Sequence, residues 1–190
     1  ATDSRRPKPD TAKAKVRDNI LALKPDVLAL QEMGSLTAFQ ELRATLKTGG
    51  LDFPNWEHIT GFDTNIHVAV LSKFPITARR PHTNDNFLLS GRRFRVGRGF
   101  AEVDIQVNPA YSFTLITAHL KSRRTVPQAD EAELRFEEAR LLREKIEVRL
   151  TANPNANLIV LGDFNDTYNT KAIKAVVGRG KTALIDVRPA

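Results

Sequence analysis

Polar side chains of three chemical kinds come directly after apolar runs of the sequence. These residues are Glu32 after "DVLALQ", His119 after "FTLITA", and Asp163 and Asn165 after "LIVLG". Apolar runs of this length predict buried strands, and a buried strand holds the polar group at its end in a fixed place. The residue types and their positions therefore indicate a site for chemistry.

The residue types fit the hydrolysis of a phosphate ester. A carboxylate such as Glu32 can hold a magnesium ion that polarises a phosphoryl oxygen. A second carboxylate, Asp163, can orient and deprotonate water, and the amide of Asn165 can fix that carboxylate and donate to the developing charge. The imidazole of His119 can stabilise or protonate oxygens of the transition state.

Each of these residues also has an ordinary structural interpretation. A glutamate after a strand is commonly a solvated surface residue, a single histidine is commonly a satisfied core or surface side chain, and Asp-Phe-Asn after glycine is a common turn. All of them, however, follow strands of the type that lies in the centre of a sheet. Adjacent central strands bring their ends together, which favours the functional interpretation.

The hydrophobic pattern predicts the elements that must position these residues. Strands are expected at 26–32, 66–72, 100–107, 111–120, 158–161 and 182–187, and helices at 11–24, 35–49, 130–152 and 170–177. The strands at 26–32 and 158–161 are expected to be buried, whereas 100–107 alternates, with Glu102, Asp104 and Gln106 on a wet face. Strands joined partly by hairpins and partly by helices predict an α/β or α+β fold with layered sheets.

Composition narrows the class of protein further. The chain has 190 residues with 41% hydrophobic content, which favours a single domain, and it has no cysteine, so a metal must sit on oxygen or imidazole ligands such as magnesium prefers. The net charge of +7 suits an anionic partner. No apolar stretch is long enough to span a bilayer and no signal peptide is visible, so we expect no integral membrane segment; composition fixes neither compartment nor oligomeric state.

Two further stretches resemble phosphate-binding motifs. The stretch "AVVGRGKT" (175–182) fits a loose phosphate-loop pattern, but a helix is expected before it and a strand after it, the reverse of the order that this loop needs. The stretch "SGRRFRVGRG" (90–99) gathers arginines around Phe94. It is either a solvated loop or a loop that grips phosphate beside the site.

Motifs in a fixed order carry a resemblance to a known family. They are "PDVLALQE", "VAVLSKFPI", "RGFAEV", "LITAHLKS" and "LIVLGDFND". In this order they closely resemble the endonuclease/exonuclease/phosphatase superfamily of deoxyribonuclease-I-like, metal-dependent phosphohydrolases. The resemblance covers residues 25–187 and implies a sandwich of two packed mixed β-sheets flanked by helices.

The resemblance also implies roles for individual residues. Glu32 matches the metal-binding glutamate of the family, His119 matches its "HL" histidine, and Asp163 and Asn165 match the catalytic Asp-x-Asn pair. Arg98 falls near an arginine that touches substrate phosphate in nucleases of this kind. Members often pair the histidine with an acidic residue, for which Glu57 and Asp63 are both candidates.

The sequence departs from the family pattern at both ends. The usual first strand with an asparagine and the usual last strand with Ser-Asp-His are absent, so residues 1–190 are expected to form a single domain that is incomplete at both ends. The expected function is a magnesium-dependent (alternatively manganese-dependent) phosphodiesterase acting on nucleic acid. The alternatives are a phospholipid or inositol-phosphate phosphoesterase of the same fold and a non-catalytic binding module.

Overall fold

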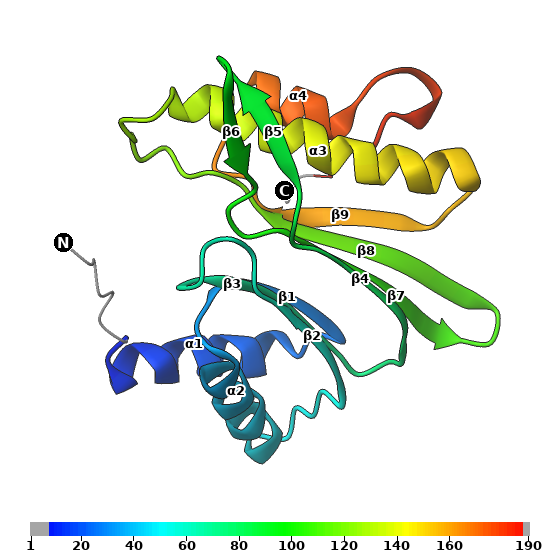
Figure 1. Ribbon diagram of the computed structural model, residues 1–190. Coiled ribbons are helices and arrows are strands. Elements are labelled where there is room, and N and C mark those ends of the chain that lie inside the picture. Colours follow the sequence, from blue (N-terminus) through cyan, green and yellow to red (C-terminus); the bar gives the residue numbers. More distant parts are fainter. Residues whose placement is uncertain (1–7, 188–190) are drawn as a thin grey trace.

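The computed structural model describes residues 8–187, which form two facing β-sheets with helices on both outer sides (Figure 1). The first sheet has the order β1-β3-β2 and the second has the order β4-β7-β8-β9. Their strands are β1 (Val27–Met33), β2 (Asn55–Ile59), β3 (His67–Ser72), β4 (Ile76–His82), β7 (Phe100–Asn108), β8 (Tyr111–His119) and β9 (Leu158–Asp163). This α/β sandwich confirms the fold class expected from the sequence.

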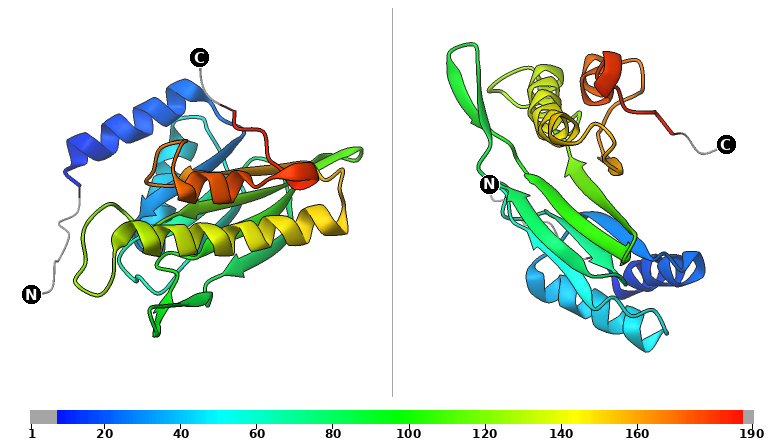
Figure 2. Two further views of the ribbon diagram at one scale, coloured as in Figure 1. Left: turned by 90° about the horizontal axis from the view of Figure 1, so that it is seen from above. Right: turned by 90° about the vertical axis from the view of Figure 1, so that its right-hand side faces the viewer.

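The helices cover the outer faces of the two sheets in pairs (Figures 1 and 2). They are α1 (Asp10–Leu23) and α2 (Leu36–Thr48) on the first sheet, and α3 (Glu131–Ala152) and α4 (Lys171–Val177) on the second. A short 3-10 helix, η1 (Gly180–Thr182), follows α4. No helix within residues 8–187 is both long and apolar enough to cross a bilayer.

Apolar side chains fill each of the spaces between these layers. The cluster between the sheets contains Val68, Val70, Val103, Ile105 and Leu115. Separate clusters pack α1 and α2 on the first sheet, around Phe39, and α3 and α4 on the second, around Phe100. β3 is apolar on both faces because it contributes to a cluster on each of them, whereas β7 adds Val103 and Ile105 to the cluster between the sheets and Phe100 to the cluster beneath α3.

Capping side chains set the starts of the helices where the sequence predicts them. The hydroxyl of Ser35 accepts a hydrogen bond from the Ala38 amide at the start of α2. The carboxylate of Asp130 accepts from the Ala132 and Glu133 amides at the start of α3. Each cap satisfies backbone donors that the first helical turn leaves unpaired.

The strands expected to be buried in sheet centres, 26–32 and 158–161, are instead edge strands. Among the described residues, β1 pairs only with β3 and β9 pairs only with β8. β1 is partly exposed along its length, and Ile159 in β9 is 42% exposed. The apolar runs were correct signs of strands, but a run of apolar residues does not say whether a second strand covers the edge.

Two other expectations are wrong. Glu102 was placed on a wet face, yet it is only 1% exposed, because Arg80 and His82 of β4 and Arg149 of α3 bind its carboxylate. The stretch 182–187 forms no strand and instead continues from η1 without regular structure. It passes beside the edge strand β9 without pairing with it in a ladder.

Candidate active site

The parallel pair β8 and β9 places His119 beside Asp163. The two residues are direct partners in the strand register, and His119 Nε2 lies 3.9 Å from Asp163 Oδ2. One position earlier, Gly162 has φ +147° and a Cβ there would lie 1.9 Å from the Ala118 carbonyl oxygen. Only glycine permits this close approach, so the glycine of "GDFND" allows the two strands to end side by side.

The turn after β9 brings Asn165 into the same place. Asp163 Oδ1 accepts a hydrogen bond of 2.9 Å from the Asn165 backbone amide, and Asn165 has φ +53°, a conformation that asparagine tolerates well. The Asn165 side-chain amide donates to the Leu120 carbonyl oxygen at 3.0 Å. The backbone of Asn165, and not its side chain as we expected, therefore orients the Asp163 carboxylate.

Glu32 approaches from the opposite sheet. It has φ +55° at an irregularity of the β1–β3 ladder between Leu30 and Met33. The neighbouring Gln31 donates from Nε2 to Thr117 Oγ1 of β8 at 2.9 Å, which ties the end of β1 to the strand that carries His119. Within residues 8–187 the exposed Glu32 carboxylate has no hydrogen bond or ion pair, so it is available as a ligand.

Arg98 and Asp63 complete the group around His119. Arg98 is 8% exposed, donates from Nη1 to the Leu120 carbonyl oxygen at 3.3 Å, and places Nε 3.8 Å from Asp63 Oδ2. Of the two acidic candidates for pairing with His119, Asp63 acts on its pKa, whereas Glu57 pairs with Arg79 at 3.3 Å. Among residues 8–187, neither candidate forms a hydrogen bond or ion pair with His119, and the charge of Asp63 acts on the imidazole less than the charges of Asp163 and Glu32 do.

The surroundings keep His119 neutral at neutral pH. Burial lowers its pKa below the usual 6.5, and the Arg98 guanidinium lowers it further, while Asp163, Glu32 and Asp63 offset part of the effect. His119 is 3% exposed, and its Nδ1 has no hydrogen-bond partner among the described residues. A buried imidazole nitrogen without a partner can serve a substrate oxygen.

The carboxylates at this edge fit a magnesium ion that is bound jointly by the protein and by the substrate phosphate. No group of three or more Asp, Glu or His side chains within residues 8–187 could enclose a metal by itself. Magnesium is commonly held by one or two carboxylates together with substrate phosphates, and the free carboxylate of Glu32 meets that requirement. The chain also offers Asp163, whose side chain is 53% exposed at the same edge.

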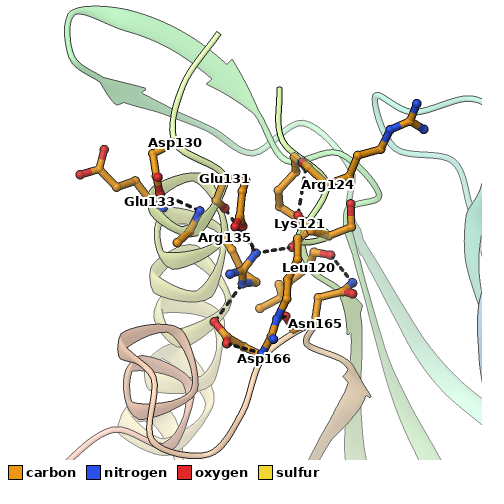
Figure 3. A network of polar contacts seen from close by, with 12 residues as sticks. Leu120, Lys121, Arg124, Asp130, Glu131, Glu133, Arg135, Asn165 and Asp166 are labelled. Atoms are coloured by element: carbon orange, nitrogen blue, oxygen red, sulfur yellow. Dashed lines mark hydrogen bonds and ion pairs between the residues drawn. The ribbon is translucent and has the colours of Figure 1, made fainter. Parts of the chain in front are cut away.

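Helix α3 contributes positioning residues that the sequence analysis missed. Arg135 is 3% exposed and donates from Nε to Asp166 Oδ2 at 2.9 Å and from Nη1 to the Lys121 carbonyl oxygen at 3.1 Å (Figure 3). Asp166 follows Asn165 directly, and Lys121 belongs to the segment that follows His119. One buried guanidinium therefore holds together the two loops that leave β8 and β9.

Glu138, one turn further along α3, holds the next pair of segments. Its side chain is buried, Oε2 accepts from the Lys121 amide at 2.6 Å, and Oε1 accepts from the Gly97 amide at 3.1 Å. Burial raises the pKa of Glu138, and the two backbone donors oppose that rise. The sequence does contain a signal for these two residues. Arg135 and Glu138 lie at the helical spacing of the buried Ala139, Leu142 and Ile146, which places them on the buried face of α3.

The family follows from a match over most of the chain. Residues 4–182 match the Endonuclease/Exonuclease/phosphatase family, and the chain belongs to that family. No curated protein sequence matches the chain. This match confirms the family that the sequence motifs resemble.

Solved structures of similar fold come from several different proteins. The human nocturnin catalytic domain with bound sulfate anion has a TM-score of 0.68 at 17% identity, covering 90% of this chain and 62% of that chain. Sphingomyelinase C from Streptomyces griseocarneus has a TM-score of 0.59 at 19% identity, covering 87% and 62%. Truncated TDP2 from Caenorhabditis elegans has a TM-score of 0.58 at 19% identity, covering 83% and 56%. At these identities the likeness shows the fold, and the chain spans less than two thirds of each of these structures.

Proposed function

We propose that the protein is a magnesium-dependent phosphodiesterase that acts on nucleic acid. The observation that carries the proposal is the meeting of Asp163 and Asn165 with His119 at one sheet edge, beside the free carboxylate of Glu32. Arg98, buried beside Leu120, adds a cation to the same edge. The proposal treats residues 1–190 as belonging to one catalytic domain.

Each residue has a role that its surroundings support. Asp163 accepts the proton of the attacking water, because its Oδ1 is fixed by the Asn165 amide while the rest of the carboxylate remains half exposed. The neutral imidazole of His119 hydrogen-bonds an oxygen of the phosphate, and Arg98 supplies positive charge close by. Glu32 would hold the metal, which we propose to be magnesium or, as the alternative, manganese. When bound, the metal polarises a phosphoryl oxygen and offsets developing negative charge.

The positive charge of the protein supports nucleic acid as the substrate. The chain carries +7, and several arginines lie close along the sequence to Arg98. Within the same fold, a phospholipid or inositol phosphate is the second candidate, because one of the similar structures is a sphingomyelinase C. A non-catalytic binding module is the third candidate, but it gives no reason for Glu32, His119, Asp163 and Asn165 to occur together.

A substrate panel under one metal condition tests the proposal. The full-length protein is assayed with bis-nitrophenyl phosphate, DNA, RNA, sphingomyelin and phosphoinositides, each with magnesium and with EDTA. We expect hydrolysis of the diester and of at least one nucleic acid, and we expect EDTA to abolish both. Cleavage that persists without metal would overturn the proposal, and hydrolysis of lipid alone would select the second candidate.

A further inference from the structure

A projecting hairpin stands next to the candidate site. It consists of β5 (Asn86–Leu89) and β6 (Arg92–Arg95), pairs with no other strand of the described chain, and extends away from the two sheets (Figures 1 and 2). It begins after Asp85, which pairs with Lys145 of α3 at 2.7 Å, and it ends at Val96, which is 1% exposed. The base of the hairpin is thus fixed, and Arg98 lies just beyond it.

The two faces of the hairpin differ in chemistry. Phe87 and Phe94 are register partners on one face, with their rings stacked at 5.8 Å between centroids. Alternation places Asn86, Leu88, Arg93 and Arg95 on the opposite face, and all of these residues are exposed. This face of the hairpin and the nearby ring of Phe62, which contacts Arg95, are together called the cationic face. No carboxylate within residues 8–187 forms a salt bridge with Arg93 or Arg95, so their charge is available to a partner.

An exposed aromatic ring joins the cationic face to the site. Phe62 is 63% exposed, and the guanidinium of Arg95 lies 5.3 Å from its ring centroid. The next residue, Asp63, donates its amide to the Gly97 carbonyl oxygen at 2.7 Å, and its carboxylate faces Arg98. The ring and the arginines therefore continue directly from the group around His119.

We propose that the cationic face binds a single strand of nucleic acid as it leaves the candidate site. The inference rests on the proposed function and adds the strand form of the substrate. Successive same-side residues of β6 lie about 7 Å apart, so Arg93 and Arg95 can meet separate phosphates of one strand. Phe62 and the Arg95 guanidinium offer planar surfaces for bases, which are open for stacking in a single strand but already stacked in a duplex.

Binding without metal tests the inference separately from catalysis. Fluorescence anisotropy of the full-length protein in EDTA is measured with a labelled single-stranded oligonucleotide, the matching duplex, and vesicles of anionic phospholipid, over a range of salt concentrations. We expect the single strand to bind more tightly than the duplex and the vesicles. Replacing both arginines (R93A/R95A) should reduce the slope of log affinity against log salt by about 1.4, because each lost contact with a single strand removes about 0.7.

Matched variants separate specific contacts from general charge. The control K15A/K47A removes the same charge from α1 and α2, on the far side of the other sheet, and should leave the slope close to wild type. F62L should weaken binding about 5- to 100-fold through the lost stacking, whereas F62Y, which keeps a ring, should bind like wild type. Turnover of bis-nitrophenyl phosphate should be unchanged in all four variants.

The outcomes that overturn the inference differ from those that overturn the proposed function. Equal effects of R93A/R95A and K15A/K47A, equal binding of duplex and single strand, or preferential binding of the vesicles would each contradict the inference. If the diester is still hydrolysed in those cases, the proposed chemistry stands. The expected binding pattern with no hydrolysis of any diester would support the cationic face and contradict the proposed activity.

Discussion

At the residue scale, replacing Asp163 tests whether this residue only forms a turn or also acts as the catalytic base. Its replacement by asparagine keeps an oxygen that can accept the Asn165 amide, so the turn should be preserved. If Asp163 activates water, the rate should fall by a factor of about 10² to 10⁴, since the neutral amide cannot take the proton. Thermal unfolding should occur at or above the wild-type temperature. Turnover of bis-nitrophenyl phosphate measures this, and full activity in D163N would contradict the assigned role.

Glu32 should respond differently to the loss of its charge, because it is proposed as a ligand and not as the base. The E32Q variant should lose activity at low magnesium and recover part of it as magnesium is raised. Its exposed carboxylate forms no ion pair with the described residues, so stability should change by less than about 0.5 kcal/mol. Turnover measured against magnesium concentration checks this, and a deficit of the same size at every concentration would argue against a ligand.

At the element scale, α3 acts as the support on which the site loops are fixed. R135M removes donors to Asp166 and to the Lys121 carbonyl and leaves a carboxylate that is only 8% exposed without its main partner. Breaking such a buried pair costs about 3–5 kcal/mol of unfolding free energy. We also expect kcat to fall, because the loop that carries Asn165 loses its anchor. Urea unfolding and steady-state kinetics measure the two effects.

Helix α3 supplies its own control for this prediction. Arg140 pairs with Glu137 but its side chain is 53% exposed, so R140M should change stability by about 0–1 kcal/mol. The double variant R135M/D166N should be less destabilised than the two single effects added together, since it removes both members of the pair. Additive losses would mean that the contact between Arg135 and Asp166 does not hold the loops.

At the scale of the whole molecule, the buried Glu102 links the second sheet to its helix layer and makes stability depend on pH. Burial would raise its pKa, but His82, Arg80 and Arg149 together hold it below the usual 4.5. A carboxyl group with a lowered pKa in the folded state stabilises the protein above pH 4.5, and this contribution is lost as the pH falls through the lower folded value. Burial of His119 acts in the same direction below pH 6.5.

Replacing Glu102 by glutamine tests this link. At pH 7 the E102Q variant should unfold with about 3–5 kcal/mol less free energy, because buried cations lose their partner. As the pH falls from 4.5 through the lower folded pKa of Glu102, the difference from wild type should shrink, since the carboxyl group is protonated first in the unfolded and then in the folded wild-type protein. Denaturant unfolding from pH 3 to pH 8 measures this, with E41Q as the control at an exposed carboxylate. A constant difference across that range would contradict the linkage.

The sequence by itself predicted the four α-helices and five of the strands, and it supplied the candidate site residues, but it did not predict β2, β4 or the hairpin of β5 and β6. Period-2 and period-3.6 patterns and side-chain caps such as those of Ser35 and Asp130 depend on neighbours along the chain, so they can be recognised without the fold. The proximity of His119 and Asp163 was predicted for a related reason. The carboxyl ends of neighbouring parallel strands lie at the same edge, and β8 and β9 are such a pair.

Only the tertiary structure decided which charges are buried and which residues they meet. Glu102 alternates like a solvent-facing residue, and the buried spacing of Arg135 and Glu138 in α3 does not say which segments they meet; the packing of α3 on the second sheet decides both. The contact of Asp63 with Arg98 likewise depended on the packing of its loop against Gly97. Burial of a charge depends on what covers it, and that cover comes from segments far away in sequence.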